Sequence, residues 1–273
     1  MLLFKHFTLA LVMAVAVSAT QPAHADGNPK GFATHRFNGS VQPVTKDGIT
    51  TFRILDKQCS SVDYGDGRGE NDCRNGNVRS ALVARGNAKI GSTVEYSMDI
   101  RIDPSFAYPG FYNDHSIGYL RDASDSRLRI ASWEGPLVHN FLYMLKVDAR
   151  HGVTFLGKQC QAPAQFGNWV SFSMRVNWTN NKSGWIDVKC NGEIVYSATN
   201  VATNQAPHCY ITNQCEKGVA KNPKSFIFIV GPVMAGFGFE WKKYGKPSPF
   251  TEIQKDGIIV QMKNIKVKKI AKG

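Results

Sequence analysis

From Thr51 onward, apolar and polar residues alternate with a period of two along most of the chain. In the segment 92–103 every second residue is apolar: Val94, Tyr96, Met98, Ile100 and Ile102. The segment 169–178 repeats the pattern with Val170, Phe172, Met174, Val176 and Trp178. Successive side chains of a strand point to opposite faces, so this alternation predicts strands that bury one face and expose the other.

Comparable patterns predict further strands at 51–55, 78–85, 128–133, 141–147, 184–197, 225–230 and 258–267. Turn-forming residues separate these segments, and the Asn191-Gly192 pair is a strong hairpin signal. No stretch has the period of an amphipathic helix longer than about two turns. The sequence therefore predicts an all-β fold, a sandwich or jelly roll of two antiparallel sheets.

The amino-terminal segment 1–25 has the pattern of a secretory signal peptide, with a basic start, an apolar run at 9–19 and the small-x-small motif Ala23-His24-Ala25. The apolar run is shorter than the roughly 20 residues that span a membrane, and no later segment is long enough. We therefore expect cleavage after Ala25, a single domain at 26–273, and a periplasmic or secreted location.

All six cysteines lie in the part that we expect to be exported. An even number in an oxidising compartment favours disulfides, although six cysteines allow about fifteen pairings. Zinc binding is less favoured because there is no C-x-x-C pair and the histidines are not clustered with the cysteines. We expect sequence neighbours to pair: Cys59 with Cys73, Cys160 with Cys190, and Cys209 with Cys215 in the long loop 200–224.

The chain carries 33 basic and 21 acidic residues, a formal net charge of +12. Such a surface attracts polyanions, and nucleic acid, anionic lipid and acidic polysaccharide all qualify. Export and the absence of a nucleic-acid-binding motif favour the polysaccharide. The alternative is a basic exported protein whose charge serves only solubility.

Several segments together resemble the heparin lyase and glucuronan lyase group of polysaccharide lyases. They are a Cys-bounded loop, Arg-Ser-x-Leu on a strand, "VEYSMDIRIDPSF" and "WVSFSMRVNWTNNKSGWIDVKCNGEIVYS". The resemblance covers about residues 52–267. It implies a concanavalin A-like jelly roll that cleaves an acidic polysaccharide by β-elimination.

β-Elimination needs a group that neutralises the uronate carboxylate, a base that removes the C5 proton and an acid that protonates the leaving oxygen. The resemblance implies an Arg and a Gln or Asn at the carboxylate, a His or Tyr as base and a Tyr as acid. Three signatures carry these groups: Arg-Ser-Glu-Leu, Gln-x-His and a late Lys-x-Gly-x-Tyr.

The first signature matches Arg79, Ser80 and Leu82, with Ala81 in place of the Glu. Alternation puts Arg79, Ala81, Val83 and Arg85 on one face of the strand. We therefore expect Arg79 to bind the substrate carboxylate and Arg85 to line the same groove, because Arg binds carboxylates bidentately.

The second signature aligns with Ala131 to Gly135, where Ser132 replaces the Gln, Trp133 is kept and Glu134 replaces the His. We expect Ser132, Trp133 and Glu134 to contact the substrate. A carboxylate beside a uronate opposes the neutralisation that the reaction needs, so His139 is a candidate for the vacant role of base.

The third signature aligns at Gly231, where Ile229 replaces the Lys and Val233 replaces the Tyr. The nearest tyrosine that could move protons is Tyr244. Lys242 and Lys243 precede it and are candidate substrate-binding residues.

Asp63, Asp66, Glu70 and Asp72 lie inside or at the end of the Cys59–Cys73 loop and could bind calcium, although their spacing is not that of an EF-hand. A solvated turn is the alternative, and we expect no cofactor.

Two functions remain open at this stage. The first is a lyase-like protein, expected to be a monomer without a nucleic-acid partner, that binds an acidic polysaccharide in a basic groove, with cleavage by β-elimination left open. The second is a non-catalytic carbohydrate-binding or envelope protein on the same fold, because a fold does not guarantee an inherited reaction. A structural periplasmic protein with unspecific charge contacts is a third, less favoured interpretation.

Overall fold

The structure is a computed structural model that describes residues 27–35, 39–55, 58–63, 71–75, 77–107, 128–134, 141–204, 226–234 and 256–271. The expected signal peptide lies outside these ranges. In them, no helix is long and apolar enough to cross a membrane. The only α-helix described is the single turn α1 (Asp72–Asn75), a 3-10 helix spans Pro163–Gln165, and all other regular elements described are strands.

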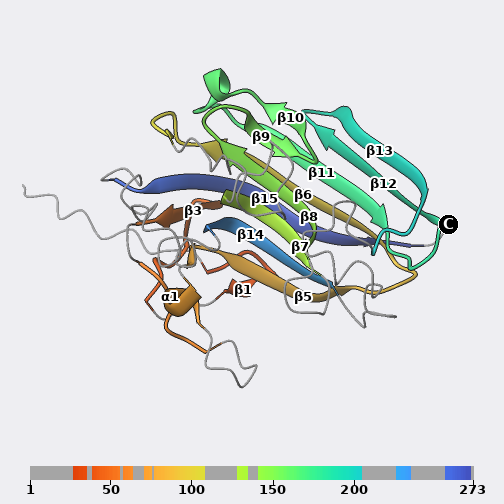
Figure 1. Ribbon diagram of the computed structural model, residues 1–273, viewed down its shortest axis with the longest axis horizontal. Coiled ribbons are helices and arrows are strands. Elements are labelled where there is room, and N and C mark those ends of the chain that lie inside the picture. The colour runs from red at the N-terminus through yellow and green to blue at the C-terminus, as the bar shows by residue number, and fades with distance from the viewer. Residues whose placement is uncertain are drawn as a thin grey trace, which may run out of the picture.

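Two antiparallel sheets lie face to face (Figure 1). The seven-stranded sheet has the order β13 (Glu193–Val201), β12 (Gly184–Cys190), β11 (Val170–Asn177), β6 (Thr93–Ile102), β15 (Ile258–Ile270), β3 (Ile49–Ile54) and β2 (Val44–Lys46). Two pairings place β15, the last described strand, between β6 and β3. The alternation seen in the sequence thus corresponds to strands with one face on the core.

The eight-stranded sheet has the order β1 (Ala33–Thr34), β5 (Leu82–Ala88), β14 (Phe226–Met234), β7 (Leu128–Glu134), β8 (Phe141–Asp148), β9 (Gly152–Phe155) and β10 (Lys158–Gln161). The short strand β4 (Val78–Arg79) also pairs with β14. All described pairings in both sheets are antiparallel. The predicted all-β sandwich of two antiparallel sheets is confirmed.

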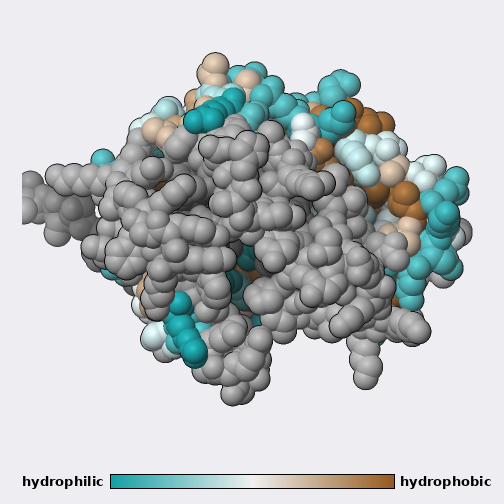
Figure 2. All heavy atoms as spheres, viewed as in Figure 1, coloured by the Kyte–Doolittle hydropathy of each residue, from teal (hydrophilic) through white to brown (hydrophobic). Residues whose placement is uncertain are grey.

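The described surface is largely hydrophilic, with some hydrophobic side chains over the β12–β13 edge (Figure 2). Among the described residues, the large hydrophobic side chains that are strongly exposed are Val44 at 51% and Ile194 at 61%. They lie on β2 and β13, the two edge strands of the seven-stranded sheet. Nearly all other large apolar side chains of the described strands are therefore buried at least in part.

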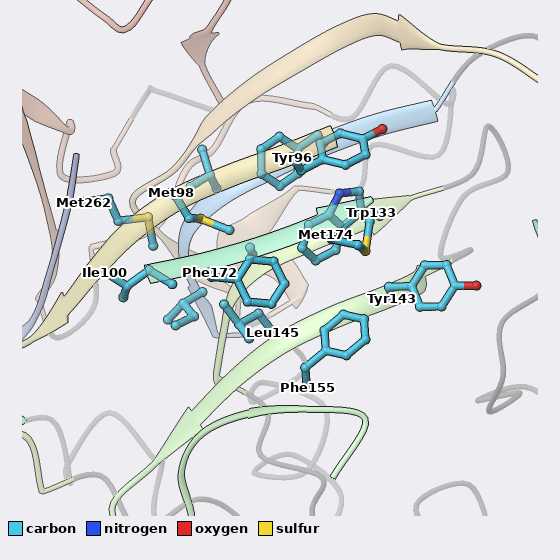
Figure 3. Close-up of a cluster of buried hydrophobic side chains, with 14 of the residues drawn as sticks. Tyr96, Met98, Ile100, Trp133, Tyr143, Leu145, Phe155, Phe172, Met174 and Met262 are labelled. Atoms are coloured by element: carbon cyan, nitrogen blue, oxygen red, sulfur yellow. The ribbon is translucent and has the colours of Figure 1, made fainter. Parts of the chain in front are cut away.

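Aromatic side chains from both sheets meet in the core (Figure 3). The rings of Trp133 on β7 and Tyr96 on β6 lie edge to face, with centroids 5.6 Å apart. Trp178, just after β11, stacks on Phe226 of β14 at 4.1 Å. Burying such rings contributes most of the free energy that holds the two layers together.

Two of the expected disulfides are confirmed. Cys59 pairs with Cys73 beside α1, and Cys160 pairs with Cys190. The second bond joins β10 of the eight-stranded sheet to the end of β12 in the other sheet, so it fastens the two layers at one edge. The proposed pair Cys209 and Cys215 lies outside the described residues.

A break in the regular pairing of β14 decides which of its side chains reach the outer face. The register with β7 shifts between Val230 and Val233. Gly231 has φ 109°, and a Cβ built on it would lie 2.4 Å from the carbonyl oxygen of Ser80 and 2.5 Å from the Phe52 ring. Only glycine fits this conformation and this space.

Gly231→Ala is expected to lower the free energy of unfolding by about 3 kcal/mol, because it combines backbone strain with a steric clash in the core. Urea denaturation of the purified protein measures this loss. Gly192→Ala is the control, since Gly192 has a similar φ of 88° but no atom near the added Cβ. Equal losses for the two variants would show that close packing at Gly231 is unimportant.

Candidate functional site

The outer face of the eight-stranded sheet, which points away from the core, carries a row of cations. Arg79 on β4 pairs with Val233 on β14, and Val233 pairs on its other side with Arg129 on β7. Arg129 in turn pairs with Lys146 on β8. Cross-strand partners point to the same side of a sheet, so these side chains lie in one line. We call Arg79, Arg129 and Lys146 the basic row; their exposed fractions are 7%, 7% and 9%.

Beside the basic row the outer face is apolar. Ala81, Val83, Ile229 and Val233 form a hydrophobic cluster that is separate from the core between the sheets. Val83 pairs with Ile229, which places this cluster on β5 and β14. The basic row is therefore bordered by side chains that lower the local dielectric and strengthen its interaction with an anion.

Arg79 is held by two side chains. It forms a salt bridge with Asp72 of α1, whose side chain is fully buried. Its Nη1 lies 2.9 Å from Nε2 of His35. A guanidinium only donates hydrogen bonds, so His35 accepts this one and carries its proton on Nδ1. Within the described residues, the Nε of Arg79 is buried without a hydrogen-bond acceptor.

The Cys59–Cys73 disulfide fixes the carboxylate that positions Arg79. Cys73 follows Asp72 directly, and its backbone N–H donates to the carbonyl of Ser60. The backbone N–H of Asn77 donates to the Asp72 carbonyl at 2.8 Å and starts the turn into β4. Closing this loop stabilises the fold by about 3 kcal/mol in the chain-entropy model.

Glu134 on β7 pairs with Ile227, which packs against the apolar cluster. It accepts a hydrogen bond from Ser132 at 3.1 Å, and one of its carboxylate oxygens is 3.7 Å from the Arg129 guanidinium. The cation offsets part of its negative charge. The register of β7 and β14, in which Ile229 pairs with Ser132 and Ile227 with Glu134, puts both side chains on the outer face. Their contact with a substrate stays a prediction.

The structure corrects the expectation for Trp133. Its ring is 0% exposed and stacks on Phe228 at 5.1 Å inside the sandwich, so it does not reach the outer face (Figure 3). The register of β7 shifts between Arg129 and Ala131. This irregularity lets Arg129 and Ser132 share the outer face while Trp133 points into the core.

The other expected site residues have different outcomes. Arg85 is exposed and pairs with Ile227 of β14, on the same face as Arg79. His139, Lys242, Lys243 and Tyr244 lie outside the described residues, so their roles stay predictions.

The described strands also contain tyrosines, but Tyr143 faces the core, and burial raises its pKa further above the ordinary value. The Tyr143 hydroxyl therefore does not reach the outer face and stays protonated, so it cannot act as the base.

The calcium prediction stays untested. Asp66 and Glu70 lie outside the described residues, and in the described part no group of three or more His, Cys, Asp or Glu side chains could hold a metal ion. Asp72 has a different partner, since it pairs with Arg79.

Sequence reasoning missed three residues of this face. Arg129 and Lys146 join the basic row through strand register, and His35 reaches Arg79 from the residue after β1. His35 is held there because its backbone N–H donates to the Ala81 carbonyl at 2.9 Å. A two-residue strand and a contact over 44 positions in sequence leave no local pattern that could have identified it.

Asp72→Asn is expected to lower the free energy of unfolding by about 3 kcal/mol, because it leaves the buried Arg79 without its counter-charge. The double variant Asp72→Asn/Arg79→Gln should lose less than the sum of the two single variants. Denaturant unfolding of all three variants gives this coupling.

Arg175→Gln is the control for that measurement. Its side chain is 50% exposed and lies 3.9 Å from Glu95, so its loss should cost about 0.5 kcal/mol or less. If the losses in free energy of unfolding from Asp72→Asn and Arg79→Gln simply add in the double variant, the two buried side chains do not interact and the expectation is wrong.

Comparison with known proteins now gives the family. A sequence model described as polysaccharide lyase matches residues 25–217, which is more than half of the chain and ends before β14 and β15. A search of curated proteins finds no significant match.

One of two similar solved structures supports the same fold, because its TM-score exceeds 0.5. An endo-β-1,4-glucuronan lyase from the fungus Trichoderma reesei aligns with a TM-score of 0.53 at 13% identity, over 90% of this chain and 94% of that one. An alginate lyase variant in complex with alginate tetrasaccharide aligns with a TM-score of 0.41 at 13% identity, over 84% and 83%. At 13% identity the likeness to the glucuronan lyase extends to the fold only.

Proposed function

Because the chain belongs to the polysaccharide lyase family, we propose that it cleaves a uronate-containing polysaccharide by β-elimination on the outer face of the eight-stranded sheet. The observation that carries this proposal is the basic row, in which Arg79, Arg129 and Lys146 share one face across neighbouring strands. A binding surface of fixed cations suits an anionic sugar chain.

The basic row would neutralise the uronate carboxylate. Removal of the C5 proton builds negative charge on that carboxylate, so cations fixed beside it lower the barrier. Asp72 already offsets the charge of Arg79, and Glu134 offsets part of that of Arg129. We assign the carboxylate to Arg129 and Lys146 together, because they are cross-strand partners on the same face.

The proton-transfer groups are assigned as alternatives. His139 and Tyr244 remain the proposed bases from the sequence. His35 joins them because its imidazole lies beside the basic row and is held neutral by the hydrogen bond from Arg79. It would have to release that bond before its Nε2 could accept a substrate proton. Ser132 is proposed to hydrogen-bond the sugar in place of an amide side chain.

One observation favours a second function, binding without cleavage. Val233 is fully buried between Arg79 and Arg129, at the position where the resemblance implied a tyrosine. A valine cannot move protons. On this alternative the same face would hold an acidic polysaccharide and leave it intact.

We further propose that the protein acts outside the cytoplasm, in the periplasm or after secretion, as a monomer. The signal-peptide pattern at 1–25 and the two disulfides support export.

The test is the ultraviolet absorbance of the new C4–C5 double bond when the mature protein acts on glucuronan, alginate or heparin, with the neutral glucan laminarin as the blank substrate. Arg129→Ala and Lys146→Ala should each reduce turnover by about 100-fold or more, the usual effect of losing one group that stabilises a transition-state charge.

Lys158→Gln on β10 is the matched control, since it removes an exposed charge away from the basic row. Arg129→Lys keeps the charge and should retain part of the activity, which separates lost chemistry from lost folding. If the protein binds the uronates without any absorbance change, the lyase function is contradicted and binding without cleavage is supported.

A further inference from the structure

The outer face of the seven-stranded sheet, on the opposite side of the sandwich, carries a second set of cations. Ser173 on β11 pairs with Lys189 on β12 and, on its other side, with Ser97 on β6. Ser97 pairs with Lys266 on β15. Two small hydroxyl side chains thus lie in one line between two lysines, and all four point away from the core.

A hollow of about 330 Å³ lies over this line. Ser97, Ser171, Ser173, Lys189 and Lys266 line it, together with Asp99 and Asn264. The register of β15 shifts between Lys263 and Lys266, and Asn264 at this bulge has φ 54°. The lining thus combines small hydroxyl side chains with two long cationic ones and one carboxylate.

A tryptophan extends the cationic surface. The Arg101 guanidinium lies 4.8 Å and the Lys263 ammonium 4.4 Å from the ring centroid of Trp169. Arg101 also donates from Nε to Gln261 at 2.8 Å. These contacts hold both cations in place next to the hollow, since Lys263 pairs with Asp99 and Asp99 with Ser171.

The carboxylates of this face have partners. Asp99 accepts a hydrogen bond from Asn264 at 2.7 Å, Asp187 accepts one from Ser197 at 2.7 Å, and Glu95 lies 3.9 Å from Arg175. In contrast, within the described ranges Lys189 and Lys266 have no ion-pair partner. The two ammonium groups are therefore available to an anion, while Asn264 holds the Asp99 carboxylate in the same hollow.

We propose that this hollow and the adjoining Trp169 form a second binding surface for an acidic polysaccharide, separate from the basic row. Lys189 and Lys266 would bind carboxylates of the sugar chain, and the serine hydroxyls would hydrogen-bond sugar hydroxyls. The choice of this polyanion rests on the proposed function. A lipid surface is a poorer fit, because the strongly exposed large hydrophobics of the described residues, Val44 and Ile194, lie on opposite edge strands.

A second surface on the far side of the sandwich changes how a polymer is held. One region of a long chain, or a neighbouring chain, binds at the hollow while another region occupies the basic row. The effective concentration of substrate at the basic row then rises without any new contact there. Short oligosaccharides that cannot reach both faces gain nothing from this effect.

The experiment is affinity electrophoresis of the mature protein in gels that contain glucuronan or alginate. In the background Arg129→Ala/Lys146→Ala, which removes two cations of the basic row, polymer should still retard the protein. Adding Lys189→Gln/Lys266→Gln should weaken the remaining affinity by about tenfold, as expected for loss of two charge contacts of up to about fivefold each. Lys189 and Lys266 are both exposed, so their substitution should leave the fold intact.

Lys158→Gln/Lys182→Gln is the matched control, because it removes the same charge from exposed positions on β10 and in the β11–β12 turn. It should change the affinity by less than about twofold. Equal weakening by both lysine pairs would overturn the proposal, as would tighter Lys189- and Lys266-dependent binding of duplex DNA or of phosphatidylglycerol vesicles.

The two proposals fail in different ways. If the unsubstituted protein cleaves no uronate but polymer binding still depends on Lys189 and Lys266, the second surface stands and the lyase function falls. If it cleaves uronates and the lysine pair has no effect on polymer binding, only the second surface is excluded.

Discussion

The arrangement of the outer face depends on the bulge in β14 at Gly231. Strand β14 lies between β4 and β5 on one side and β7 on the other, so its register decides which residues of four strands face the same way. The bulge brings Val233 opposite both Arg79 and Arg129. It exists because residue 231 has no side chain, which lets the backbone pass close to Ser80 and Phe52. A backbone constraint in the core thus sets the chemistry of the surface.

The sequence was sufficient for the fold because burial on one side of a strand leaves a period-two pattern. It was less informative about the site, because a strand irregularity moves residues to the opposite face without leaving such a pattern. Strict alternation puts Arg129 and Trp133 on one face of β7, whereas the register shift between them separates them. Lys146 and His35 were missed for a related reason, since both join the site through pairings between distant strands. Asp72 was noticed as a carboxylate, but only the structure pairs it with Arg79.

The two outer faces differ in how their cations are surrounded. In the basic row the side chains are almost fully buried, and each guanidinium has a carboxylate nearby. On the other sheet the lysines are exposed and stand around a hydroxyl-lined hollow. Buried, fixed charges suit the stabilisation of a charge that develops during a reaction, whereas exposed lysines suit weak, salt-sensitive attachment to a polymer. Under the two proposals, these surroundings assign cleavage to the basic row and polymer retention to the hollow.

The position of the last strands has a consequence for how the chain folds. Strand β15 lies in the middle of the seven-stranded sheet and β14 in the middle of the other, although both come from the carboxyl-terminal fifth of the sequence. Until β15 is synthesised, no strand joins β6 to β3. Until β14 is synthesised, no strand joins β5 to β7, so neither sheet can close. Such non-local pairing makes folding slow and places it after translation of the final strand. The unfinished chain therefore keeps the edges of β6, β3, β5 and β7 unpaired, which exposes it to wrong strand partners until the last segment is made.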